Sequence, residues 1–174
     1  PKGKRIEIYG IPGNELGCYM DGTDIEVFAS GQDAVGNTMN DGSIVIHGSA
    51  GDALGYAMRG GKIFIEKNVG YRCGIHMKEF KEAKPVIVIG GYAGAFLGEY
   101  MAGGIVVLLG RNLPEDKFAA AGYCATGMHG GVMYLPKSIP LTHYSKEVKV
   151  EETTDEDKAV IEKYIDEYCG YFSA

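Results

Sequence analysis

The sequence contains no tryptophan, no excess of positive charge and no long apolar run. Its 23 acidic residues outnumber its 17 basic residues, which gives a formal net charge of −6. Nucleic-acid surfaces need clustered lysine and arginine, so we expect no DNA or RNA partner. A membrane helix needs about 20 consecutive apolar residues, and the sequence contains neither such a run nor a recognisable signal peptide. We therefore expect a cytoplasmic protein with no membrane partner.

The sequence is also poor in residue patterns that form metal or nucleophilic sites. Its four cysteines form no C-x-x-C pair, so neither a zinc site nor a redox dithiol is indicated. Cys73 and His76 form C-x-x-H, but no second pair supplies the remaining zinc ligands. His47, His129 and His143 have no companion serine or cysteine in a recognisable nucleophile motif. The sequence therefore predicts no catalytic, cofactor-binding or metal-binding residues in this chain.

Glycine is abundant instead, with 27 residues, and it recurs within a repeat. The stretch GYAMRGGKIFIEKN, residues 55–68, combines a glycine, a methionine three residues later, a glycine pair and a strand-like segment. The glycines and methionines recur every 19 residues, at Gly17, Gly36, Gly55 and Gly74 and at Met20, Met39, Met58 and Met77. Strand-like segments begin at Ile6, Ile25, Ile44, Ile63, Val86, Ile105 and Val132. Two charged, proline-containing stretches, KEFKEAKP and RNLPEDKF, lengthen the later steps and are interpreted as loops.

A repeat of 19 residues with one strand is too short for a pair of helices and suits one turn of a parallel solenoid. The sequence predicts an all-β fold, a single-stranded right-handed parallel β-helix of about seven rungs over residues 1–136. The right-handed preference of parallel crossovers sets the predicted hand. Residues 137–174 are predicted to be a linker followed by a C-terminal amphipathic helix.

The alternation of side chains along each strand predicts two faces. The predicted inward pairs are Ile6/Ile8, Ile25/Val27, Ile44/Ile46, Ile63/Ile65, Val86/Val88 and Ile105/Val107. The predicted outward column is Glu7, Glu26, Val45, Phe64, Ile87, Val106 and Met133, which begins acidic and becomes apolar. An apolar outward wall is not expected to face water, so the sequence predicts that something covers it.

The C-terminal segment TTDEDKAVIEKYIDEYCGYF could supply that cover. Thr153 and Glu156 have the spacing of a capping box, which predicts the start of the helix. Val160, Ile161, Tyr164, Ile165, Tyr168 and Phe172 fall on one apolar face. We expect this face to pack on the β-helix or on a partner subunit.

Two acidic residues are candidates for a carboxylate pair. Asp33 and Asp52 lie one repeat apart, so a solenoid would stack them at about 5 Å, a separation suited to a retaining glycosidase or a calcium site. The alternative is that both are turn residues whose side chains hydrogen-bond to nearby backbone. The second interpretation is the simpler one, because like charges stacked this closely repel each other.

The motifs GNELGCYMDG, GNTMNDGSIVIHGSAGDALGYAMRGGKIFIEKNVGYRCGIHM and GEYMAGGIVVLLG resemble the glycine-repeat (GXGXG) domain at the C-terminal end of the glutamate synthase large subunit. A related domain forms one of the subunits of formylmethanofuran dehydrogenase. The resemblance covers residues 6 to about 135. It implies a structural domain whose FMN, iron–sulfur cluster and glutaminase nucleophile lie in other domains or subunits.

The resemblance implies a non-catalytic subunit of a split glutamate synthase, with glutaminase-like and FMN/iron–sulfur synthase chains as partners. The alternatives are a subunit of a formylmethanofuran dehydrogenase-like complex and, in another class, a stand-alone carbohydrate-active β-helix. Self-association is a further expectation. The candidate interface residues are Phe64, Ile87, Val106, Glu79 and Lys81.

Overall fold

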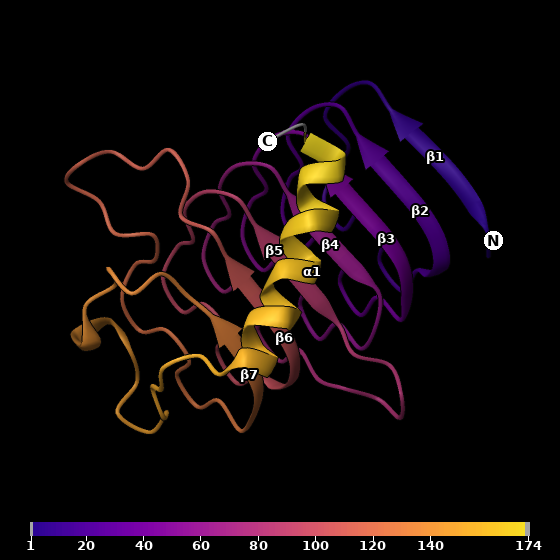
Figure 1. Ribbon diagram of the computed structural model, residues 1–174. Helices are drawn as coiled ribbons and strands as arrows, with labels where there is room; N and C mark the ends of the chain where they lie inside the picture. The colour runs from indigo at the N-terminus through magenta and orange to yellow at the C-terminus, as the bar shows by residue number, and fades with distance from the viewer. Residues whose placement is uncertain (1, 173–174) are drawn as a thin grey trace.

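The computed structural model describes residues 2–172 and contains one parallel sheet whose strands follow chain order (Figure 1). Each strand pairs with the next, so the chain makes one circuit of a coil between neighbouring strands. The strands are β1 (Lys4–Ile8), β2 (Asp21–Val27), β3 (Asp41–Ile46), β4 (Lys62–Ile65), β5 (Val86–Ile89), β6 (Ala102–Leu108) and β7 (Gly130–Tyr134). The predicted parallel β-helix is confirmed, with about six turns joining the strands.

The glycine repeat is explained by close packing between successive turns. Gly17, Gly36 and Gly55 have φ values of 72°, 71° and 68°, a left-handed conformation that favours glycine. A Cβ atom added at Gly36 would lie 2.4 Å from Cδ1 of Ile63, and one added at Gly55 would lie 2.5 Å from Cδ1 of Ile87. Each glycine thus leaves room for an isoleucine of a later strand. The glycine and isoleucine periods belong to one packing arrangement.

The interior of the coil is a single apolar cluster built from stacked columns. Ile44, Ile63 and Ile87 stack from strand to strand and are fully buried. The methionine column fills the adjoining corner, and Met39, Met58, Met77 and Met101 are fully buried there. Flexible thioethers suit such irregular corners.

The structure corrects the predicted register after residue 80. Ile63 pairs with Ile87, not with Val86, because the segment between β4 and β5 is one residue longer than predicted. A one-residue slip moves every following side chain to the opposite face. Ile87 and Val106 were predicted to point outward, and this placement is wrong: both lie in the interior cluster and are fully buried.

The same slip applies to the residues that were predicted to point inward. Val86, Val88 and Val107 belong to a second apolar cluster on the outer side of the sheet, and Ile105 packs against it. Met133, also predicted to face outward, packs against the interior cluster. The prediction of an apolar outward wall on the later strands stays correct, although different residues form it.

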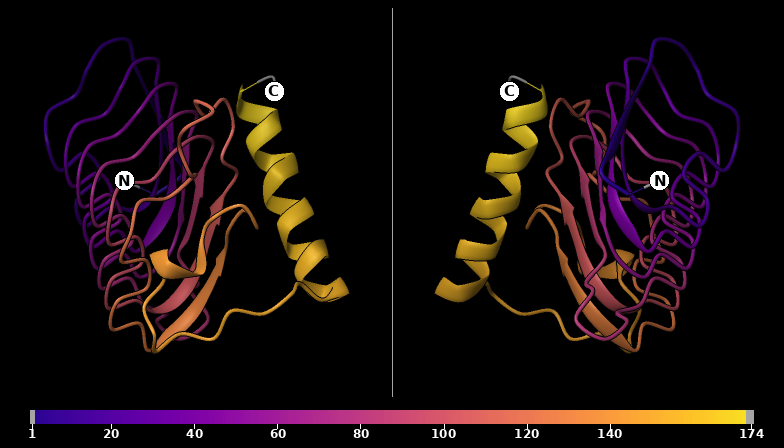
Figure 2. Two further views of the ribbon diagram at one scale, coloured as in Figure 1. Left: turned by 90° about the vertical axis from the view of Figure 1, so that its left-hand side faces the viewer. Right: turned by 90° about the vertical axis from the view of Figure 1, so that its right-hand side faces the viewer.

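Helix α1 (Asp155–Phe172) covers that wall. It runs obliquely across the outer face of the sheet and leaves β1 and β2 uncovered (Figures 1 and 2). Tyr164 and Tyr168 are its buried residues and lie against Val45, Phe64, Val86, Val88 and Val107. Among residues 2–172, no helix has the length and apolar character of a membrane span.

The start of α1 differs by one residue from the prediction. Asp157 N donates to Thr154 Oγ1 at 3.2 Å, and Thr154 N donates to Asp157 Oδ2 at 2.8 Å. This reciprocal arrangement is a capping box with Thr154 as the N-cap. The predicted pair of Thr153 and Glu156 is therefore wrong, because the helix begins at Asp155.

The two ends of the coil differ in how far the described residues cover them. The segment after β7 folds back over the C-terminal end, where Cys124 N donates to His143 O and Ser145 N donates to Cys124 O, both at 2.8 Å. Ile139 from this segment is buried in the interior cluster. At the N-terminal end, β1 forms the edge of the sheet, and all its residues except the half-buried Ile8 are exposed.

Candidate functional site

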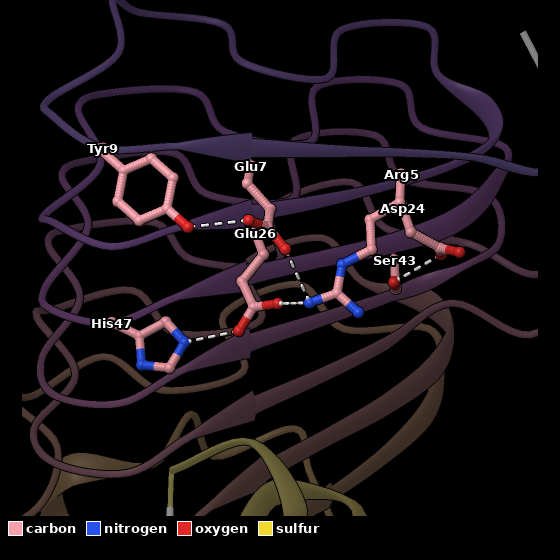
Figure 3. Close-up of polar contacts among 7 residues, drawn as sticks. All are labelled: Arg5, Glu7, Tyr9, Asp24, Glu26, Ser43 and His47. Atoms are coloured by element: carbon pink, nitrogen blue, oxygen red, sulfur yellow. Dashed lines mark hydrogen bonds and ion pairs between the residues drawn. The ribbon is translucent and has the colours of Figure 1, made fainter.

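The outward face of β1, β2 and β3 carries a connected group of polar side chains (Figure 3). Glu26 lies at its centre, because one carboxylate oxygen is 2.6 Å from Arg5 Nη2 and the other is 2.8 Å from His47 Nε2. Arg5 also lies 3.1 Å from Glu7, which accepts a 2.8 Å hydrogen bond from the Tyr9 hydroxyl. Parallel pairing in register places these side chains on neighbouring strands. We call this group the outer polar cluster.

An aromatic ladder runs beside the outer polar cluster. The rings of Tyr9 and Phe28 stack with their centroids 4.8 Å apart, and Phe28 stacks on His47 at the same distance. His47 then meets Phe172 of α1 edge to face at 5.0 Å. The ladder therefore joins the edge of the sheet to the C-terminal end of the helix. Tyr9, Phe28 and His47 each directly follow a strand, and their 19-residue spacing is the sequence signal for the ladder. The contact with Phe172 has no such signal in the sequence.

The outer polar cluster does not form a nucleophilic site. A nucleophile must lie within hydrogen-bonding distance of its base. Ser43 lies on β3 beside the cluster, and its hydroxyl donates to Asp24 Oδ1 at 2.6 Å and not to His47 (Figure 3). The hydrogen bond to Glu7 raises the pKa of Tyr9, which opposes formation of a phenolate there. The geometry is that of a surface ion-pair network. Such a network holds its own side chains in place, and its charged groups can form ion pairs with another molecule.

The predicted carboxylate pair has a role in backbone hydrogen bonding. Asp33 Oδ1 accepts from Asp52 N at 2.8 Å, and Asp52 Oδ1 accepts from Tyr71 N at the same distance. Asn14 Oδ1 accepts in the same way from Asp33 N at 3.1 Å. A Cβ added at Gly51 would lie 2.0 Å from Asp33 Oδ1, so the neighbouring glycine makes room for the carboxylate. This geometry supports the interpretation of Asp33 and Asp52 as turn residues.

A second ladder of the same kind was not recognised in the sequence. Ser49 N donates to Ser30 Oγ at 3.2 Å, Asn68 N donates to Ser49 Oγ at 3.3 Å, and Tyr92 N donates to Asn68 Oδ1 at 2.8 Å. The signal is the 19-residue spacing of Ser30, Ser49 and Asn68. Two side-chain ladders thus supply hydrogen bonds where the coil has no strand.

The structure separates the predicted interface residues into three environments. Phe64 faces outward as predicted and is fully buried beneath α1. Ile87 and Val106 lie inside the coil. Glu79 accepts from Gly104 N at 3.2 Å, which ties the loop to β6. Lys81 remains on the exposed loop, with its Nζ 5.3 Å from the centre of the Phe80 ring.

The structure does not bring Cys73 and His76 together as a pair of metal ligands. Cys73 is buried in the interior cluster, where burial strongly raises its pKa, whereas His76 points outward and stacks on Tyr100 at 5.2 Å. Burial also raises the pKa of Cys124 to about 11. Within residues 2–172, no group of three or more histidine, cysteine, aspartate or glutamate side chains is placed to hold a metal ion.

Comparison with known proteins relates this coil to a family. The sequence matches the GXGXG motif family over residues 2–174. It is also 50% identical over 173 residues to an uncharacterized protein, MJ1350, of Methanocaldococcus jannaschii. That alignment covers 97% of this chain and 65% of the relative, so the chain spans about two thirds of the relative's length. No solved structure matches the chain. The chain belongs to the GXGXG motif family.

Proposed function

We propose that this chain is a non-catalytic structural subunit of a split glutamate synthase. The observation that carries the proposal is the GXGXG match over residues 2–174, because this domain is found in glutamate synthase. In this proposal the chemistry belongs to partner chains. A glutaminase-like chain releases ammonia from glutamine, and a chain with FMN and an iron–sulfur cluster makes glutamate.

The coil has physical properties that suit a spacer between such partners. Its interior is closely packed, and ladders of backbone and side-chain hydrogen bonds join successive turns. Parallel pairing continues in register across most of the sheet, with irregularities at β2–β3 and β6–β7. Close-packed interiors have low compressibility. A coil of this kind can hold two partners at a fixed separation without supplying a reactive group.

The exposed loops are the proposed contacts with the partner chains. The loop at 78–85 presents Phe80 beside Lys81, and the loop at 111–118 presents Phe118. Both phenylalanines are exposed, at 54% and 45% of their surface. Aromatic side chains are enriched in protein interfaces, and loops carry binding residues more often than the scaffold beneath them does. The charges of Glu79 and Lys81 would then set the orientation of the partner.

Reconstitution tests the proposal directly. The partner chains are combined with and without this chain, and both complex size and glutamine-dependent glutamate formation are measured. We expect omission to lower assembly and glutamate formation together. Glutamate formation that is unchanged by omission would overturn the proposal.

Loop variants make this test sharper. The double variant Glu79→Lys with Lys81→Glu keeps the net charge and reverses the local pattern, so we expect it to weaken assembly. Lys146→Glu with Glu147→Lys, an equivalent swap on the exposed segment that covers the C-terminal end of the coil, is the matched control. Equal assembly by both variants would remove the 78–85 loop from the interface while leaving the subunit role intact.

A further inference from the structure

Within residues 2–172, six short turns, one from each circuit of the coil, stack on one another. They are residues 14–19, 33–38, 52–57, 71–76, 95–100 and 122–127, and we call the surface that they form the turn face. Backbone hydrogen bonds join each turn to the next, as Ala34 N donates to Asp52 O and Thr38 N donates to Tyr56 O, both at 2.8 Å. Helix α1 packs on the outer face of the sheet and not on these turns (Figure 2). The four middle turns thus have neighbouring turns of the same coil on both sides and no described helix over them.

Besides the repeat glycine, two positions in every turn have a left-handed backbone, with φ between 50° and 65°. Glycine adopts this conformation without steric cost, whereas other residues rarely adopt it. Along the coil these positions form two columns. The first column is Glu15, Ala34, Ala53, Arg72, Phe96 and Tyr123, and the second is Tyr19, Thr38, Ala57, His76, Tyr100 and Gly127. The fold accepts small residues in both columns, so the large ones need another explanation.

The size of the side chains divides the turn face into two halves. The second and third turns carry Ala34, Thr38, Ala53 and Ala57, whereas the fourth and fifth turns carry Arg72, His76, Phe96 and Tyr100. His76 stacks on Tyr100 at 5.2 Å, and Phe96 stacks on Tyr123 of the sixth turn at 5.0 Å. Tyr100 and Tyr123 nonetheless remain 44% and 65% exposed. One half of the face is therefore raised and rich in aromatic residues, which are enriched in protein interfaces, and the other half is flat.

We propose that the turn face pairs with the turn face of a second copy of this chain. The two coils run in opposite directions, with the twofold axis between the third and fourth turns, so the raised half of each copy lies on the flat half of the other. The opposed pairs are Arg72 and Ala53, His76 and Ala57, Phe96 and Ala34, Tyr100 and Thr38, Tyr123 and Glu15, and Gly127 and Tyr19. This pairing does not depend on a role in glutamate synthase.

Other arrangements of the two faces are less favourable. If the coils ran in the same direction, each column would face the other column, and Phe96 would lie opposite Tyr100 of the second copy. Moving the axis to the fourth turn would place Arg72 opposite Arg72 of the second copy, and like charges in contact oppose association. Moving the axis to the third turn would place Tyr100 opposite Tyr19 of the second copy. The axis between the third and fourth turns avoids all three conflicts.

Polar groups of the turn face also fit this register. Arg72 lies opposite an alanine, but its Nε is 2.9 Å from Glu99 Oε2 of its own chain. Pairing therefore buries no uncompensated charge there. Tyr123 lies opposite Glu15 of the second copy, whose carboxylate can accept a hydrogen bond from the phenol. Six turns spaced by about 4.8 Å make the paired surface roughly 25–30 Å long.

Exchanging a large and a small residue tests the pairing. The mass of the intact chain is measured in solution across a concentration series for the wild type, Ala34→Phe and the double variant A34F/F96A. We expect a wild-type dimer, a dissociation constant raised about tenfold or more by A34F, and recovery to within about threefold in the double variant, where the large and small positions have changed places. Leu141→Phe, at a position that is 74% exposed outside the turn face, is the matched control and should leave the dimer unchanged. A wild type that stays monomeric at every concentration would overturn the proposal, as would a dimer that A34F does not weaken.

Crosslinking tests the register independently of affinity. In a chain with Cys18 and Cys169 replaced by serine, the double variant A34C/F96C places each new thiol opposite one of the second copy. Within one chain the two positions lie three turns apart, about 14 Å, so a short bismaleimide reagent joins two chains and not two sites of one chain. The single variants A34C and F96C are matched controls, because their thiols in the two copies would also lie three turns apart. We expect a covalent dimer from the double variant alone. Equal crosslinking of all three variants, or of none, would contradict this register, and circular dichroism shows that each variant is folded.

Discussion

Strands β1 and β2 share an inward face with strands β4, β5 and β6 but differ from them in their outward face. Inward residues such as Ile25 and Val27 in the first region and Ile63 and Ile65 in the second are aliphatic and belong to one interior cluster. Outward residues are Arg5, Glu7 and Glu26 in the first region and Phe64, Val86 and Val107 in the second. The repeat therefore determines the interior everywhere. The outward residues instead depend on what covers each turn, which is α1 over the second region and, among residues 2–172, no helix or strand over the first.

The largest expected loss of stability follows the removal of Tyr168, which holds helix α1 against the sheet. Tyr168 is fully buried, donates to Glu66 O at 2.8 Å and accepts from Arg111 at 3.2 Å. Tyr168→Ala removes a buried aromatic ring and should lower the free energy of unfolding by about 3–5 kcal/mol. Chemical denaturation measures the change.

Tyr9→Ala is the matched variant in the uncovered region. Tyr9 is 78% exposed, so its loss should change the free energy of unfolding by about 0.5 kcal/mol or less. Equal losses in the two variants would contradict the division of the outward face.

A second variant tests the corrected register of the later strands. Ile87→Ala should cost about 2–5 kcal/mol, because it opens a cavity inside the coil. Val132→Ala, at a position that is 44% exposed on β7, should cost much less. Denaturation midpoints compare the two. A small effect at Ile87 would contradict its burial inside the coil.

Two glycine variants should change stability in opposite directions. A Cβ added at Gly90 would lie 2.0 Å from the Tyr168 hydroxyl, so Gly90→Ala should displace that ring and cost about 1–3 kcal/mol. Gly170 lies within α1 with no atom near its added Cβ, so Gly170→Ala should stabilise by up to about 1 kcal/mol. Thermal unfolding checks both signs. Stabilisation by Gly90→Ala would contradict the close contact between Gly90 and Tyr168.

The smallest expected effect concerns the start of α1. Hydrogen bonds from the Thr154 backbone and side chain, and then from Tyr134, hold the pKa of Asp157 below its ordinary value of 3.8. A carboxylate with a lowered pKa stabilises the fold above its ordinary pKa, and this contribution is lost as pH falls through the lowered value. Asp157→Asn should therefore be less stable than the wild type at neutral pH. The two should converge once the pH falls below the lowered pKa of Asp157, and a difference that persists there would exclude the carboxylate as its source.

The interior was predictable because glycine, methionine and isoleucine all recur with the same period. The inward or outward direction of side chains after residue 80 was predicted from the strand-like segments alone, although the methionine positions carried a further signal. Met58 precedes the inward Ile63 by five residues, and Met101 precedes the inward Val106 by five residues. Since Ile, Val and Leu occupy both faces of these strands, hydrophobicity cannot show which residues face inward. The position of the methionine five residues earlier does show it.

The candidate site was less predictable because its contacts join residues distant in the sequence. The repeat places Glu7 beside Glu26, but it does not show that Arg5 and His47 both turn toward Glu26. It also does not show that Phe172 completes the aromatic ladder, since the path of α1 depends on the whole outer wall. The Asp33 and Asp52 ladder, by contrast, follows from the repeat and from the tendency of aspartate to bond with nearby backbone.

The measurement that tests the central claim most directly is purification of the tagged chain from its own organism, with co-purifying proteins identified by mass spectrometry. The account predicts recovery with a chain that carries FMN and an iron–sulfur cluster and with a glutaminase-like chain, in fixed proportion. Recovery with a molybdenum or tungsten enzyme, or without either expected partner, would contradict a role in glutamate synthase.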